Sequence, residues 1–125
     1  MKDGKLHTGE DFNKAAFIFQ HGGTPGDYLL AHTLAVVAIA RGDSSAIWIA
    51  SATLDRYLMS IKQPQIYGTQ YSWNNQDPTT QDPYNRELIS DPLRQALHVP
   101  TLAEQETRRK QIDADRHLPS PAPAH

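Results

Sequence analysis

A short set of polar side chains interrupts otherwise apolar, helix-patterned sequence, and these side chains could perform chemistry. They occur in three places: Gln20-His21, Asp55-Arg56 and Tyr67-Gly68-Thr69-Gln70. Burying a polar group without a hydrogen-bond partner costs about 1–3 kcal/mol, and burying an unpaired charge costs more. Polar groups at the edges of packed helices therefore either satisfy one another or stay available to a ligand.

These residues could together form a small-ligand site. We expect His21 to be the catalytic base, because an imidazole has an ordinary pKa of about 6.5. Asp55 would orient the imidazole, and Arg56 would hold a carboxylate or phosphate through its planar guanidinium group. The side chains expected to hold a polar ligand by hydrogen bonds are Gln20, Tyr67, Thr69 and Gln70.

The same residues also fit a structural interpretation. Asp55 and Arg56 would then clamp residues 67–70, with Arg56 donating to backbone carbonyls and Thr69 capping a turn at Gly68. His21 would complement the negative end of its helix. Two functions therefore stay open: a site that binds or hydrolyses a small polar or anionic ligand, and a non-catalytic protein-interaction module whose polar residues form a structural network.

No cofactor or metal site is predicted. The chain has no cysteine, and its histidines show neither H-x₃-H nor H-E-x-x-H spacing. It also lacks a G-x-S-x-G motif, a phosphate-binding loop and a dinucleotide fingerprint. The glycine-rich residues 22–26 open a helix and could hold an anion, but they fit an ordinary turn between helices equally well.

Length and charge narrow the class of protein. A chain of 125 residues fits one domain. A formal net charge of −2 gives no general attraction to nucleic acid or to an anionic membrane, so neither partner is expected. The longest apolar run, residues 28–40, is too short to span a bilayer of about 30 Å. With no signal peptide at the first residues, a cytoplasmic location is the default expectation.

The elements that must position these residues are mostly helices. Capping residues and apolar periodicity predict helices at about 9–21, 25–41, 44–62 and 102–115, and shorter pieces at about 84–89 and 92–98. The charged last helix is expected to face solvent. Aromatic and β-branched residues predict one short β-like segment or hairpin near 65–82. The expected fold is thus mainly α: a small bundle of three core helices plus a C-terminal helix, in a single domain (1–115) with a disordered Pro/Ala tail (116–125).

Several motifs together resemble a known family. They are Gly9-Glu10-Asp11, Ala15-Ala16, Gln20-His21, Leu54-Asp55-Arg56, P-Q-I-Y-G-T-Q at 64–70 and V-P-T-L-A-E at 99–104. The combination, which covers residues 8 to about 106, resembles the DUF6624-type family of bacterial proteins. The chain departs from that family at 99–101, where relatives have two prolines, and ahead of Thr8, where relatives have another helix. The resemblance implies a helical fold, and it implies no activity because the family has none assigned.

Overall fold

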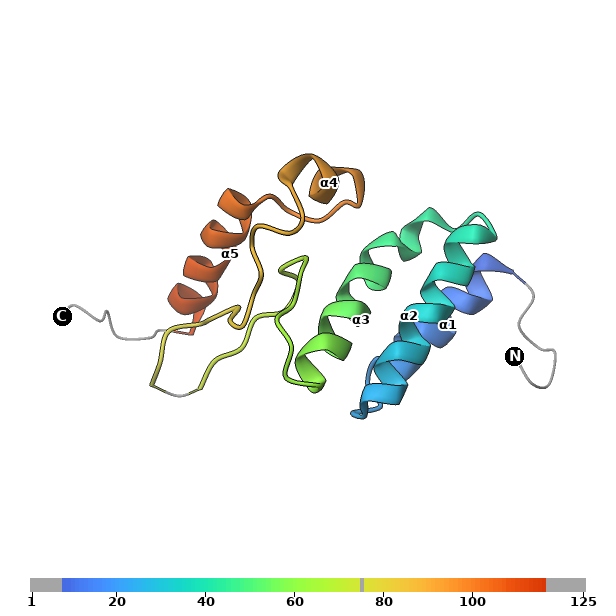
Figure 1. Cartoon of the computed structure of the whole chain (residues 1–125), viewed down its shortest axis with the longest axis horizontal. Coiled ribbons are helices and arrows are strands. Elements are labelled where there is room, and N and C mark those ends of the chain that lie inside the picture. Colours follow the sequence, from blue (N-terminus) through green and yellow to red (C-terminus); the bar gives the residue numbers. More distant parts are fainter. Residues whose placement is uncertain (1–7, 75, 117–125) are drawn as a thin grey trace.

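The computed structural model describes residues 8–74 and 76–116, and this part of the chain is mainly α. Its elements are α1 (Gly9–Phe19), α2 (Pro25–Ala40), a 3₁₀ turn η1 (Ser44–Ala46), α3 (Ile47–Ser60), α4 (Asp91–Ala96) and α5 (Leu102–Asp115) (Figure 1). None of the described helices is both long and apolar enough to cross a membrane. The predicted mainly α class is therefore confirmed. From residue 117 on, the expected tail lies outside the described residues.

Threonine side chains start three of the helices at the predicted positions. Thr8 and Asp11 form a complete capping box at α1, and Thr101 and Glu104 form another at α5. Thr24 caps α2, where a proline follows in the first turn. Each cap gives a hydrogen-bond acceptor to a backbone N–H that has no partner within its helix, and this fixes where the helix begins.

The first three helices pack into the predicted core, with α2 between α1 and α3 (Figure 1). Small side chains on α2 allow both neighbours to approach closely. Gly9 marks one such approach, since a Cβ at this position would lie 2.9 Å from the carbonyl oxygen of Ala38. The buried core residues are Phe12, Ala16, Leu34, Ala35, Ala38, Ala46, Ile49 and Ala50.

The predicted β-like region forms two isolated bridges, and no strand is present in the described residues. Ser72 and Thr80 exchange two backbone hydrogen bonds of 2.8 and 2.9 Å in an antiparallel bridge. The pairing ends early because the Gln65 side chain takes backbone partners that a strand would use. Its side-chain amide accepts a hydrogen bond from the N–H of Gln70 and donates to the carbonyls of Gln70 and Gln81.

One expectation for the second half of the chain is wrong, and another holds only in part. The predicted helix at 84–89 is a turn at 86–88, because Gln65 bridges to Tyr84 and fixes the backbone on both sides of it. The last helix also does not simply face solvent. Gln105 and Ile112 of α5 are buried against the segment that joins α3 to α4 (Figure 1).

Candidate functional site

Asp55 binds Ile66, Tyr67 and Thr69 of the segment that follows α3, an arrangement that we call the Asp55 clamp. Its carboxylate is fully buried, with 0% exposure, and it accepts four hydrogen bonds. Oδ1 accepts the backbone N–H groups of Ile66 at 2.8 Å and Tyr67 at 3.0 Å. Oδ2 accepts the N–H of Thr69 at 3.0 Å and its hydroxyl at 2.7 Å. Since an ionised carboxylate only accepts hydrogen bonds, a cluster of four donors matches its chemistry.

Gly68 makes the turn inside the clamped segment possible. Its φ is +82°, in the left-handed region that favours glycine. A Cβ at this position would also collide with the amide of Gln105 and the hydroxyl of Tyr84. The turn thus brings the backbone of residues 67 and 68 directly against α5.

Glutamine side chains form the interior between this segment and α5. Gln81 donates to the carbonyl of Gly68 and to the Gln105 Oε1, both at 2.9 Å. Gln105 donates to the carbonyls of Tyr67 at 3.0 Å and Pro100 at 2.8 Å. The second half of the molecule is therefore held by directional hydrogen bonds between amides and backbone.

Arg94 extends this network toward α4. It is 1% exposed and donates to the Tyr84 hydroxyl at 3.1 Å, to the carbonyl of Arg86 at 3.0 Å and to Asp91 at 3.0 Å. The Tyr84 hydroxyl also reaches the Gln105 Oε1, at 2.9 Å. Sequence reasoning missed these residues, because isolated glutamines and a single arginine follow no apolar periodicity.

Arg56, the next residue after Asp55 on α3, has no such partners. Its side chain is half-buried, and it makes no hydrogen bond or ion pair with any residue of 8–74 or 76–116. The Nε atom is buried and unpaired. The expected donation from Arg56 to backbone carbonyls is therefore absent in the described structure.

Arg56 borders a surface cleft of about 310 Å³ at the end of α3. The cleft lies beside the first turn of α2 and the segment after the Gly68 turn. Its lining residues are Tyr28, Arg56, Met59, Ser60, Gln70, Tyr71 and Ser72. The cleft thus combines one cation with several hydroxyl and amide groups and with the apolar parts of two tyrosines and a methionine.

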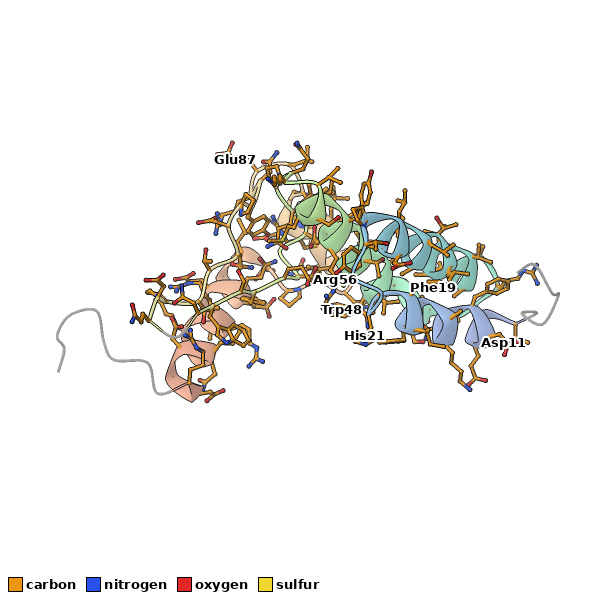
Figure 2. All side chains as sticks on the ribbon, turned by 90° about the horizontal axis from the view of Figure 1, so that it is seen from below. Asp11, Phe19, His21, Trp48, Arg56 and Glu87 are labelled. Atoms are coloured by element: carbon orange, nitrogen blue, oxygen red, sulfur yellow. The ribbon has the colours of Figure 1, made fainter. Side chains whose placement is uncertain are left out.

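His21 and Asp55 make no hydrogen bond with each other in the described structure. His21 is exposed just after the end of α1 (Figure 2), and its ring makes no hydrogen bond with the described residues. The oxygens of Asp55 are occupied by residues 66–69, so this carboxylate does not orient the imidazole. The neighbouring Gln20 is buried and does not line the Arg56 cleft.

The remaining predicted ligand-binding residues separate into three places. Thr69 belongs to the Asp55 clamp, and Gln70 lines the Arg56 cleft while its side chain donates to the Thr69 hydroxyl at 3.0 Å. Tyr67 lines a different groove, of about 280 Å³, between α2 and α3. Burial raises the pKa of Tyr67, and the charge of Asp55 raises it further. Arg56 and Gln70 are thus the two predicted residues that share a cleft.

No family model, curated protein or solved structure matches this chain. The resemblance to the DUF6624-type family accordingly stays a prediction from motifs. The residues that carry it have clear structural positions: Asp55 and Arg56 lie on α3, and residues 64–70 form the segment that Asp55 clamps.

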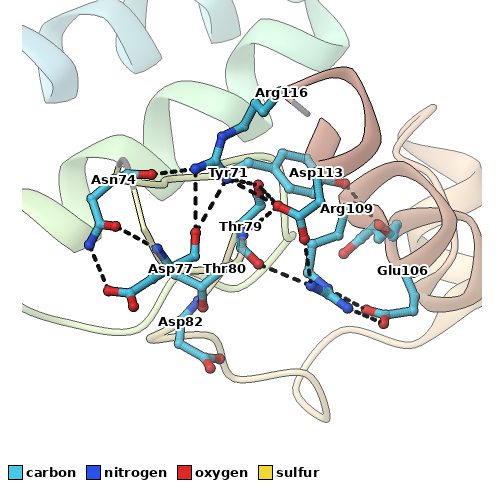
Figure 3. Close-up of polar contacts among 11 residues, drawn as sticks. Tyr71, Asn74, Asp77, Thr79, Thr80, Asp82, Glu106, Arg109, Asp113 and Arg116 are labelled. Atoms are coloured by element: carbon cyan, nitrogen blue, oxygen red, sulfur yellow. Dashed lines mark hydrogen bonds and ion pairs between the residues drawn. The ribbon is translucent and has the colours of Figure 1, made fainter. Parts of the chain in front are cut away.

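A second charged network ties α5 to the loop near Thr79 (Figure 3). Asp113 accepts the N–H of Thr79 at 2.7 Å and its hydroxyl at 2.6 Å, and Arg109 and Arg116 flank this carboxylate. Burial alone would raise the pKa of Asp113. The Thr79 hydrogen bonds and the two arginine charges outweigh that effect and lower it.

Among the described residues, no group of three His, Cys, Asp or Glu side chains is placed to hold a metal ion.

Proposed function

We propose that this domain binds a small anionic ligand in the cleft beside Arg56. The observation that carries the proposal is the guanidinium group of Arg56, which lines the cleft and has no partner within residues 8–74 and 76–116. An arginine provides a planar fork of donors that matches a carboxylate or phosphate group. A ligand anion would supply the acceptor that the described protein does not.

The position of Asp55 strengthens this proposal. Asp55, the acid next to Arg56 in the sequence, does not neutralise it. Here both oxygens of Asp55 are already used by Ile66, Tyr67 and Thr69 on the clamped segment. Leaving a buried donor unpaired costs about 1–3 kcal/mol, so a ligand that pairs with Arg56 would recover part of that free energy.

The lining of the cleft favours binding over acid–base catalysis. No imidazole or carboxylate is among the described residues that border it. Gln70, Ser72 and Tyr28 would position a bound anion through hydrogen bonds. The catalytic roles expected for His21 and Asp55 stay predictions, and neither residue is needed for the binding function proposed here.

A second candidate function is a non-catalytic protein-interaction module whose polar residues are structural. The Asp55 clamp favours it, because all four donors around this carboxylate come from the chain itself. The two candidates differ in what they require of Arg56. A purely structural network would lose stability without this side chain, whereas a ligand site would lose affinity.

Arg56→Met tests the proposal, with Arg56→Lys beside it and Arg108→Met as a control. Arg108 is a cation on α5 that does not line the cleft. Thermal unfolding should show Arg56→Met within about 0.5 kcal/mol of the parent or more stable, since no described hydrogen bond or ion pair is lost and methionine keeps much of the apolar stem. Two-dimensional NMR should show that acetate or inorganic phosphate shifts the Arg56 side-chain resonance and the amides of residues 70–72.

Two results would overturn the proposal. The first is a loss of more than about 2 kcal/mol in Arg56→Met, because this would show that Arg56 stabilises the fold. The second is an unchanged spectrum of the folded parent protein with tens of millimolar acetate or phosphate. Arg56→Lys should bind more weakly than the parent, since an ammonium group cannot form the two parallel hydrogen bonds of a guanidinium.

A further inference from the structure

The Arg56 cleft offers a single full positive charge. Among the seven described residues that line it, only Arg56 is ionic at neutral pH, and no acid opposes it. Burial raises the pKa of Tyr71, the charge of Arg108 acts to lower it and the charge of Glu106 acts to raise it, so one cation and one acid of α5 both lie near this wall without bordering the cleft.

Helix dipoles add little net charge at this site. Met59 and Ser60 belong to the last turn of α3, where the helix dipole gives a partial negative charge. Tyr28 belongs to the first turn of α2, where the partial charge is positive. These two partial charges oppose each other, which leaves Arg56 to balance the ligand. A phosphate group with two negative charges would keep one of them unpaired here.

The walls of the cleft are largely apolar. The half-buried rings of Tyr28 and Tyr71 and the side chain of Met59 supply carbon surface and an adaptable thioether. The Tyr71 hydroxyl is turned to the carbonyl of Gln105 at 3.4 Å, so it already has a partner. Aromatic side chains bury large apolar areas, and they pack well against another ring.

The volume of the cleft suits a small ligand. At about 310 Å³ it lies at the lower end of the roughly 300–1,000 Å³ range of ligand pockets. A single ring with a short acidic side chain fits such a volume. A nucleotide carries at least two groups, a base and a phosphate, that would each need a built site.

We infer that the Arg56 cleft selects a monocarboxylate that carries an aromatic group, in preference to phosphate-bearing ligands. The carboxylate would pair with the guanidinium of Arg56, and the ring would pack between Tyr28, Met59 and Tyr71. This inference rests on the proposed anion-binding function and adds the chemical class of the ligand. Either a free aromatic acid or the C-terminal residue of a peptide has this chemistry.

Isothermal titration calorimetry of the whole chain with small probes tests the inference. The probes are phenylacetate, acetate, inorganic phosphate and the neutral phenylacetamide. Phenylacetate should bind at least about tenfold more tightly than acetate or phosphate, a difference of about 1.4 kcal/mol. Phenylacetamide should bind more weakly than phenylacetate, because it lacks the charge. Arg56→Met should abolish phenylacetate binding, and Arg108→Met should change it by no more than about twofold.

The outcomes separate this inference from the proposed function. If acetate and phosphate bind as tightly as phenylacetate, the ligand class is wrong and the anion site stands. If no probe binds the folded protein, the proposed function fails as well. N-acetylphenylalanine distinguishes the two sources: tighter binding than phenylacetate assigns a peptide C-terminus, and weaker binding assigns a free acid.

Discussion

Replacing Asp55 with Asn tests whether this carboxylate joins the two halves of the molecule. The substitution keeps the shape of the side chain and exchanges one acceptor oxygen for an NH₂ group. If the remaining oxygen faces Ile66 and Tyr67, the NH₂ group meets the N–H of Thr69, which is also a donor. The variant therefore loses the hydrogen bonds on one side of the clamp, together with the negative charge that strengthens the other side.

The cost follows from the contacts. A hydrogen bond to a charged group contributes about 1.5–3 kcal/mol. With two of four bonds lost at a fully buried residue, we expect Asp55→Asn to lower the free energy of unfolding by about 3–6 kcal/mol. That is a large fraction of the roughly 5–15 kcal/mol by which a domain is stable.

Urea unfolding measures the effect, because the two tryptophans report on different parts of the chain. Trp48 is on α3, and Trp73 is on the segment after the clamp. Asp82→Asn is the matched control, because Asp82 is an exposed carboxylate whose ion pair with Arg86 contributes at most about 1 kcal/mol. A value for Asp55→Asn within about 0.5 kcal/mol of this control would refute the assigned role of the clamp.

Two further predictions concern the same half of the molecule. Gly68→Ala should lower the free energy of unfolding in urea by about 3 kcal/mol or more. The added Cβ would meet Gln105 and Tyr84, and the backbone of an alanine would have to keep the positive φ of residue 68. Gly42→Ala, with φ +94° and open space around it, should cost about 1 kcal/mol, and equal losses would contradict the steric argument. The pKa of Asp113 is lowered in the folded protein, so its contribution is present above its unfolded pKa of about 3.9 and disappears as pH falls through the folded value. Asp113→Asn should therefore reduce stability at neutral pH and weaken the fall in stability below about pH 4, as followed by circular dichroism; an unchanged acid profile would contradict this.

The helices were predictable because their signals are local. Thr8, Thr24 and Thr101 cap helices at the positions that their sequence context indicates. The three-helix core follows from the apolar faces of the first three helices, because each such face is stabilised when it is buried against a neighbouring helix. The turn at 86–88 was not predictable in this way, since it depends on the bridge between Gln65 and Tyr84, which are far apart in the chain.

The candidate site was only partly predictable. The sequence indicated that Asp55 and residues 67–70 belong together, and a clamp of this segment was one of the two interpretations. The different surroundings of Asp55 and Arg56 were not predictable, because they depend on which of the two side chains meets residues 66–69, which lie more than ten residues further along the chain. His21 is exposed in the turn after α1 and makes no hydrogen bond with Asp55, whose oxygens bind residues 66–69 instead, and nothing in the sequence around His21 indicates this.

The glutamine interior affects how the two halves of this chain tolerate substitution. In the three-helix core, Leu34 or Ile49 can be exchanged for another apolar residue of similar volume, because dispersion forces have no preferred direction. Gln65, Gln81 and Gln105 have no such substitutes, since each is defined by which of its atoms donates and which accepts. One half of the molecule is thus specified by volume, and the other half by the polarity of individual atoms.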